Sequence, residues 1–179
     1  DFTISVATGV IHFVNSYIAT FLLPFVIIAY LGYEARIAGL LMAAIPVANI
    51  VVSPAAGHLS DRMGFRILTT GGLVMRAIGF FMFVLVDRQS PLWLFVAILV
   101  ILGIGAGIFG APNNSSLLGA TPKDRLGIGS SIIAFARNLG MLMGISFSAI
   151  LLAWREAHYG AVAEVADTAA NSLHQSRAF

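Results

Sequence analysis

The chain has 179 residues, of which 59% are hydrophobic and 10% are charged. Its mean hydropathy is +0.93. Soluble domains carry about 25% charged residues, so this chain has too few for a water-facing shell, and we expect a membrane protein. The net charge of +2 is too small to indicate a nucleic-acid-binding protein, and the lack of cysteine excludes disulfides and Cys-ligated metals.

Charged residues are confined to short segments between long apolar runs. A helix rises about 1.5 Å per residue, so about 20 apolar residues cross the hydrocarbon core. The runs are continuous and not alternating, which argues against a transmembrane barrel. We therefore predict an all-α membrane protein with five transmembrane helices, at about residues 3–30, 37–56, 67–86, 91–111 and 126–154. Residues 155–179 are expected to form a surface loop, tail or short helix. Because the chain opens on Asp1 and has no sixth span, we expect a fragment.

The connection between the second and third spans combines turn-forming and charged residues, and it reads G-H-L-S-D-R-M-G-F-R from Gly57 to Arg66. Gly64 can adopt the positive φ that a tight reversal often needs. Asp61 is expected just before the third span, where the positive end of the helix dipole favours a carboxylate. Arg62 and Arg66 suit the cytoplasmic headgroup layer.

This loop resembles the signature of the major facilitator superfamily, G-x-x-x-D-R-x-G followed by two basic residues. The matching residues are Gly57, Asp61, Arg62, Gly64 and Arg66. Phe65 stands where a basic residue is expected, a departure that favours the C-terminal half of such a protein. The resemblance implies a helical half-bundle without its sixth helix, and a loop that acts as a conformational switch.

A second stretch is similar to the fourteen-helix drug:proton antiporters of that superfamily. A loop with Pro122, Arg125 and Gly127 leads into a helix that carries Arg137-Asn-x-Gly140-x-x-x-Gly144. The resemblance implies a multi-pass protein of the cell (inner) membrane, with residues 57–66 and 113–125 cytoplasmic and 155–179 extracytoplasmic. It further implies three partners: the lipid bilayer, a small-molecule substrate and a missing N-terminal half.

The first span carries polar or small residues at steps of three or four, which places them on one helix face. They are Ser5, Gly9, His12, Ser16 and Thr20, with Asn15 alongside. Such a face fits the wall of a water-filled cavity better than a lipid-facing surface. His12, Asn15 and Ser16 are therefore cavity or substrate candidates. His12 is a hypothetical proton carrier, and the alternative is a hydrogen-bonded histidine without a coupling role.

Arg76 lies near the centre of the third span, where an arginine costs about 2.5–3.5 kcal/mol on insertion scales. The Asp and Glu residues lie near predicted membrane ends or in the tail, so none is expected close to Arg76. We consider three partners: backbone carbonyls, an acid from the missing half, or an anionic substrate. Arg76 is thus a further cavity candidate.

Arg137 in the fifth span shares a helix face with Gly140 and Gly144. The glycines, with Ser148, form a ladder of small residues that permits close helix contact. We therefore expect Arg137 to point into the bundle, with a structural or gating role favoured over substrate contact.

Glycines in the fourth span formally match a dinucleotide-binding pattern, G-x-G-x-x-G, from Gly105 to Gly110. A dinucleotide site needs a strand before the pattern and a helix starting at it. Here the pattern lies inside one apolar run, so we expect no cofactor, and Gly103 and Gly107 are interpreted as a packing surface. The sequence shows no metal-ligand spacing and no catalytic triad, so we do not expect an enzyme.

The leading functional hypothesis is a fragment of a secondary transporter that exports small organic compounds or drugs in exchange for protons. One alternative is an uptake transporter for an anionic small solute, because two arginines within the spans suit anions. Another is a non-transporting membrane scaffold whose glycine-rich faces bind a partner protein.

Overall fold

The computed structural model describes the backbone of residues 2–87 and 89–176, and the side chains of residues 3–87, 89–122 and 124–158. These residues form α-helices with short π and 3-10 segments and no strand. The α-helices are α1 (Phe2–Phe25), α2 (Ala35–Met42), α3 (Ala44–Met63), α4 (Phe65–Met82), α5 (Leu92–Gly119) and α6 (Leu126–Ser176). A π-helix, Val26–Tyr30, continues α1, and 3-10 turns lie at Phe83–Leu85 and Lys123–Arg125.

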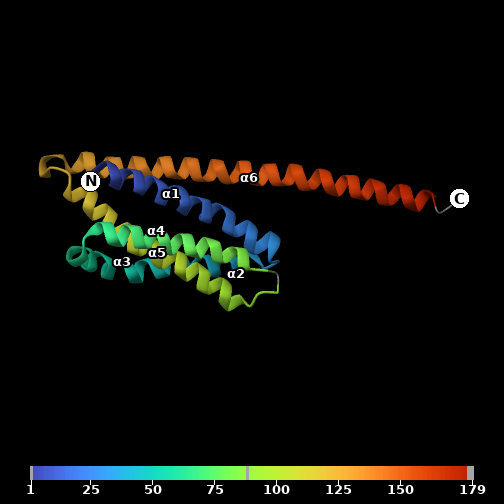
Figure 1. Cartoon of the computed structure of the whole chain (residues 1–179), viewed down its shortest axis with the longest axis horizontal. Coiled ribbons are helices and arrows are strands. Elements are labelled where there is room, and N and C mark those ends of the chain that lie inside the picture. Colours follow the sequence, from blue (N-terminus) through green and yellow to red (C-terminus); the bar gives the residue numbers. More distant parts are fainter. Residues whose placement is uncertain (1, 88, 177–179) are drawn as a thin grey trace.

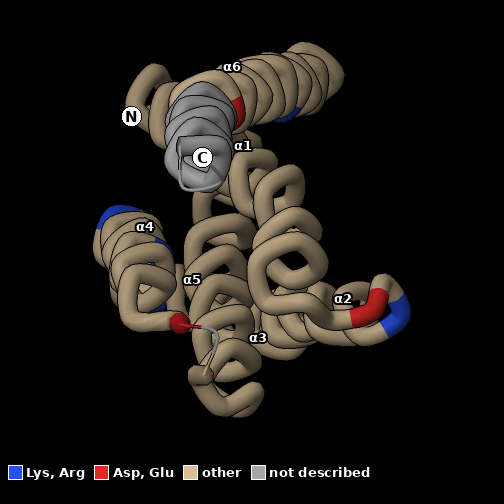
Figure 2. Tube along the Cα trace, turned by 90° about the vertical axis from the view of Figure 1, so that its right-hand side faces the viewer, with Lys and Arg blue, Asp and Glu red and all other residues tan. Residues whose placement is uncertain are grey.

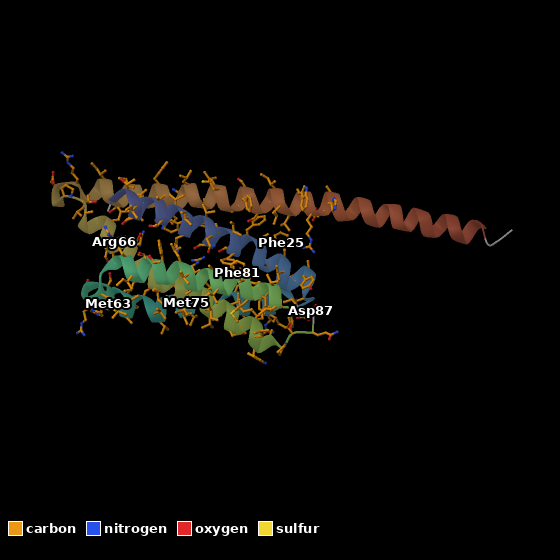
Figure 3. All side chains as sticks on the ribbon, in the orientation of Figure 1. Phe25, Met63, Arg66, Met75, Phe81 and Asp87 are labelled. Atoms are coloured by element: carbon orange, nitrogen blue, oxygen red, sulfur yellow. The ribbon has the colours of Figure 1, made fainter. Side chains whose placement is uncertain are left out.

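Five helical stretches are long and apolar enough to cross a membrane: Thr3–Tyr30, Ala35–Met63, Phe65–Leu85, Leu92–Gly119 and Leu126–His158. The predicted all-α fold with five spans is therefore confirmed. Successive spans run in opposite directions (Figure 1), so the connections alternate between the two ends of the bundle. Figure 3 shows this separation, with Met63 and Arg66 at one end and Asp87 at the other.

Helix α5 lies at the centre of the bundle and packs against α3, α4 and α1 (Figure 2). Glycines let the backbones approach closely on two of its faces. A Cβ atom at Gly107 would lie 3.0 Å from the carbonyl oxygen of Asn49 on α3, and one at Gly103 would collide with Ile45 on the same helix. The predicted packing role of Gly103 and Gly107 is therefore confirmed.

Helix α6 packs along α1 through the predicted ladder of small residues, and the two helices run in parallel (Figure 1). A Cβ atom at Gly140 would collide with Phe13, and one at Gly144 would lie 2.7 Å from the carbonyl oxygen of Val14. Ser148, which is fully buried, donates a hydrogen bond to the carbonyl oxygen of Gly144. The ladder is the contact face of α6.

The second span differs from the single helix predicted at residues 37–56. It starts at Ala35, is interrupted at Ala43 and continues to Met63. Pro46 lies in the first turn of α3, where its missing N–H is tolerated, so the interruption comes just before it. The reversal into α4 is much shorter than predicted, because Gly64 alone lies between α3 and α4, with φ of 83°.

The fourth and fifth spans also extend beyond their predicted ends. Helix α5 continues to Gly119 through Pro112, so residues 113–119 are helical and do not belong to a loop. Helix α6 continues to Ser176, whereas residues 155–179 were expected to form a loop, tail or short helix. The polar, Ala-rich composition after residue 155 accounts for this difference, since alanine has the highest helix propensity. Residues 177–179 lie outside the described part.

Candidate functional site

A buried arginine joins α4 to α1 in the middle of the bundle. Arg76 is only 4% exposed, although it belongs to a helix whose other side is apolar and exposed. Its side chain passes the backbone of α5 at Gly105, where an added Cβ atom would lie 2.7 Å from Cγ of Arg76. The glycine thus provides the space that the side chain needs to reach α1.

Three polar side chains of α1 accept hydrogen bonds from Arg76. Nε donates to Oδ1 of Asn15 at 2.9 Å, and Nη1 donates to Oγ of Ser16 at 2.9 Å. Nη1 also lies 3.4 Å from Nδ1 of His12. We call these four residues, His12, Asn15, Ser16 and Arg76, the Arg76 cluster. The structure therefore brings together all four predicted cavity candidates.

The partners of Arg76 correct the sequence interpretation. The three partners considered were backbone carbonyls, an acid from the missing half and an anionic substrate. The structure instead supplies neutral side chains from the first helix, a combination that the sequence analysis did not consider. The information was present, because the polar face of α1 and the mid-span arginine lie at similar depths in their helices.

His12 is neutral in this arrangement. Because a guanidinium group has only donors, Nδ1 of His12 must act as the acceptor in the contact with Arg76. The imidazole ring stacks on Phe109 of α5, with ring centroids 4.3 Å apart, and meets the edge of Phe13. Arg76 is the charged group that faces His12. Protonation of Nδ1 would therefore require Arg76 to move away.

A second polar layer links α1 to α5 nearer the end of the bundle that carries the α3–α4 turn. Oγ1 of Thr8 donates to Oδ1 of Asn113 at 3.3 Å, and the hydroxyl oxygens of Ser5 and Ser116 lie 3.3 Å apart. Asn113 is only 4% exposed. Asn113 was expected in the cytoplasmic segment 113–125, and it is buried because α5 continues past Pro112.

The residues of the predicted switch loop lie at the α3–α4 turn. Asp61, Arg62, Gly64 and Arg66 are exposed, and Gly57 is half-buried within α3. The structure corrects the placement of Asp61, which lies in the last turn of α3 and not at the start of the next helix. The C-terminal end of α3 carries the negative end of the helix dipole, which stabilises Arg62 and not the carboxylate of Asp61.

Arg137 does not join the Arg76 cluster. It is exposed on α6, whereas Gly140 and Gly144 are buried against α1. Arg137 is thus exposed among the described helices, and its orientation into the bundle stays a prediction for the full-length protein. Helix α6 approaches α1 so closely at Gly140 that no long side chain fits between them, and an arginine one turn away must extend outwards.

Similarity to known proteins identifies the family of this chain. The sequence model of the Major Facilitator Superfamily matches residues 4–163. The chain belongs to the major facilitator superfamily. The resemblance inferred from the α3–α4 turn is thereby confirmed, and the chain is part of an integral, multi-pass membrane protein.

Several curated proteins are similar to this chain. The riboflavin transporter RibZ of Clostridioides difficile is 34% identical over 147 residues, which cover 82% of this chain and 32% of RibZ. The multidrug resistance protein Stp of Mycobacterium tuberculosis is 30% identical over 70% of this chain and 24% of Stp. The methyl viologen resistance protein SmvA of Salmonella typhimurium is 28% identical over 68% of this chain and 24% of SmvA. The chain thus spans about a third or less of the length of these relatives.

Proposed function

We propose that the full-length protein containing this chain is a secondary transporter that exports small organic compounds in exchange for protons. The Arg76 cluster carries this proposal, because polar and ionisable groups inside a membrane bundle mark substrate or ion pathways. Membership of the superfamily supports transport. The names of Stp and SmvA, a multidrug resistance and a methyl viologen resistance protein, support export and the fourteen-helix branch.

Within this proposal the chain forms the C-terminal half, and α1 and Arg76 line one wall of a central cavity. The α3–α4 turn, with Gly57, Asp61, Arg62, Gly64 and Arg66, faces the cytoplasm and changes its contacts when the two halves move. Residues 113–125 lie at the same end, and the residues after 155 lie at the extracytoplasmic end.

A second candidate function is uptake of an anionic small solute. The charge of Arg76 is met only by neutral side chains among the described residues, so the cluster keeps a positive charge that an anion would balance. The similarity to a protein named riboflavin transporter also supports a substrate other than a drug. A third hypothesis, a non-transporting scaffold, rests on the glycine-rich faces alone, and in this structure those faces are filled by α3, α4 and α1.

Flux through the purified full-length protein in proteoliposomes separates these functions. We expect an imposed proton gradient to drive accumulation of a cationic dye against its concentration gradient. Accumulation of an organic anion, with no movement of the dye, would support uptake of an anionic solute. No flux of either compound, from an intact and monodisperse protein, would contradict transport.

The same assay tests proton coupling through His12. In a His12→Gln variant the side-chain oxygen can still accept a hydrogen bond from Arg76, but the residue cannot titrate. Protonation of His12 requires Arg76 to move away, so the wild-type flux is expected to depend on pH, and the variant should lose this dependence. An unchanged pH profile would remove His12 from the coupling mechanism.

A further inference from the structure

The exposed arginine of α6 lies at a depth where lipid cannot accept it. Arg137 is about 16 Å along α6 from Leu126 at the helical rise of about 1.5 Å per residue. One turn further on, Gly140 packs against Phe13, the neighbour of His12. Arg137 is therefore within about one turn of the level of the Arg76 cluster, too deep for its side chain to extend to the headgroups.

The described helices offer Arg137 no partner. Neither a hydrogen bond nor an ion pair joins it to a described residue, in contrast to Arg76. The described carboxylates, at Glu34, Asp61, Asp87, Asp124 and Glu156, all lie near helix ends or beyond the predicted core. Any acid that neutralises Arg137 within the bilayer must therefore come from outside this part of the chain.

We propose that the Arg137 side of α6 is an interface with another transmembrane segment of the full-length protein, and that this segment supplies a carboxylate to Arg137. The chain covers only 32% of RibZ and 24% of Stp, so proteins as long as these relatives have further segments that can cover the face. A carboxylate balances the positive charge of the guanidinium, and its two oxygens can accept the two parallel N–H donors.

The residues around Arg137 define which side of α6 is covered. Ala134 and Met141, one turn before and after Arg137, are half-buried at the border of the α1 contact. Leu142 points away from this side and is 63% exposed. The interface is therefore expected to run along α6 next to α1, with Leu142 facing lipid.

Site-specific photo-crosslinking in the full-length protein tests the interface independently of transport. A benzophenone side chain at Met141 is expected to form an intramolecular crosslink to a transmembrane segment outside residues 1–179, located by mass spectrometry. The same probe at Leu142 should give lipid adducts. A probe at Met141 that labels only lipid, or only a second copy of the protein, would overturn the proposal.

Charge reversal then tests the carboxylate. Arg137→Glu is expected to lower the transport rate at least about tenfold, because it removes one partner of a buried pair and places two like charges together. Reversing the acid found in the crosslinked segment should do the same, and the double reversal should restore the rate to within a fewfold of wild type. Thermal unfolding in detergent should follow the same pattern. Failure of every crosslinked acid to rescue Arg137→Glu, or wild-type behaviour of Arg137→Gln in both assays, would overturn the proposal.

Discussion

Replacing Arg76 by alanine is expected to lower the free energy of unfolding of the full-length protein by about 1–3 kcal/mol and the transport rate at least about tenfold. The substitution leaves Oδ1 of Asn15 without its donor Nε, and Nδ1 of His12 without its donor Nη1. Arg76 is 4% exposed and His12 is 8% exposed, so the acceptor of His12 is left buried without a hydrogen bond, which is what makes the loss costly. Thermal unfolding in detergent and flux in proteoliposomes measure the two effects.

Two further variants serve as comparisons for Arg76→Ala. One crowds the side chain of Arg76 without removing its charge, and the other removes an arginine outside the cluster. Gly105→Ala places a methyl group against Cγ of Arg76 and against the carbonyl oxygen of Gly72 on α4, so it should lower stability and transport through the α4–α5 contact while keeping the charge. Arg155→Ala removes an exposed arginine near the far end of the membrane span and should change stability by less than about 0.5 kcal/mol. If Arg76→Ala changes stability and transport as little as Arg155→Ala does, the Arg76 cluster neither stabilises the contact between α4 and α1 nor takes part in transport.

The same substitution at two glycines of α6 is expected to have opposite effects. Gly140→Ala should destabilise the protein by about 1–3 kcal/mol, because the new methyl group collides with Phe13 and crowds Val14 across the α1 contact. Gly127→Ala meets no atom within 4 Å, so it should be neutral or slightly stabilising, since alanine is the better helix former by about 1 kcal/mol.

Thermal unfolding of the two variants in one detergent gives the comparison. Both substitutions add the same atoms to the same helix, so the difference between them reports only the α1–α6 contact. Equal unfolding temperatures would show that α6 does not pack on α1 through Gly140 and Gly144 in the full-length protein.

The five spans and the packing glycines could be predicted because each depends on the chain's own local pattern. A long, continuous apolar run in lipid forms a helix, because a helix makes all of its backbone hydrogen bonds within the segment. Small residues at four-residue spacing, such as Gly140 and Gly144, indicate where two such helices meet. The polar face of α1 likewise indicated that His12, Asn15 and Ser16 face protein or water.

The sequence predictions fell short where the position or partners of a side chain depend on helices that are distant in the sequence. Nothing local shows that Gly105 opens a path for Arg76 to reach α1, so its neutral partners were missed. Arg137 lies about 60° around the helix axis from Gly140 and is exposed among the described helices, because only small residues fit the α1–α6 contact. Helix ends were underestimated for a simpler reason. Helices continue beyond the apolar core, so α3 runs past Asp61 to the single turn residue Gly64.

Side-specific cysteine labelling tests most directly whether these five helices span the membrane with the α3–α4 turn inside the cell. This chain has no cysteine, so Asp61→Cys and Asp87→Cys in a cysteine-free full-length protein each introduce a single thiol. Asp61 lies two residues before Met63 at the end of α3, and Met63 and Asp87 lie at opposite ends of the bundle (Figure 3). In intact cells we expect a membrane-impermeant maleimide to label position 87 and to reach position 61 only after the membrane is opened. Labelling of position 61 in intact cells, or equal labelling of both positions, would contradict the account.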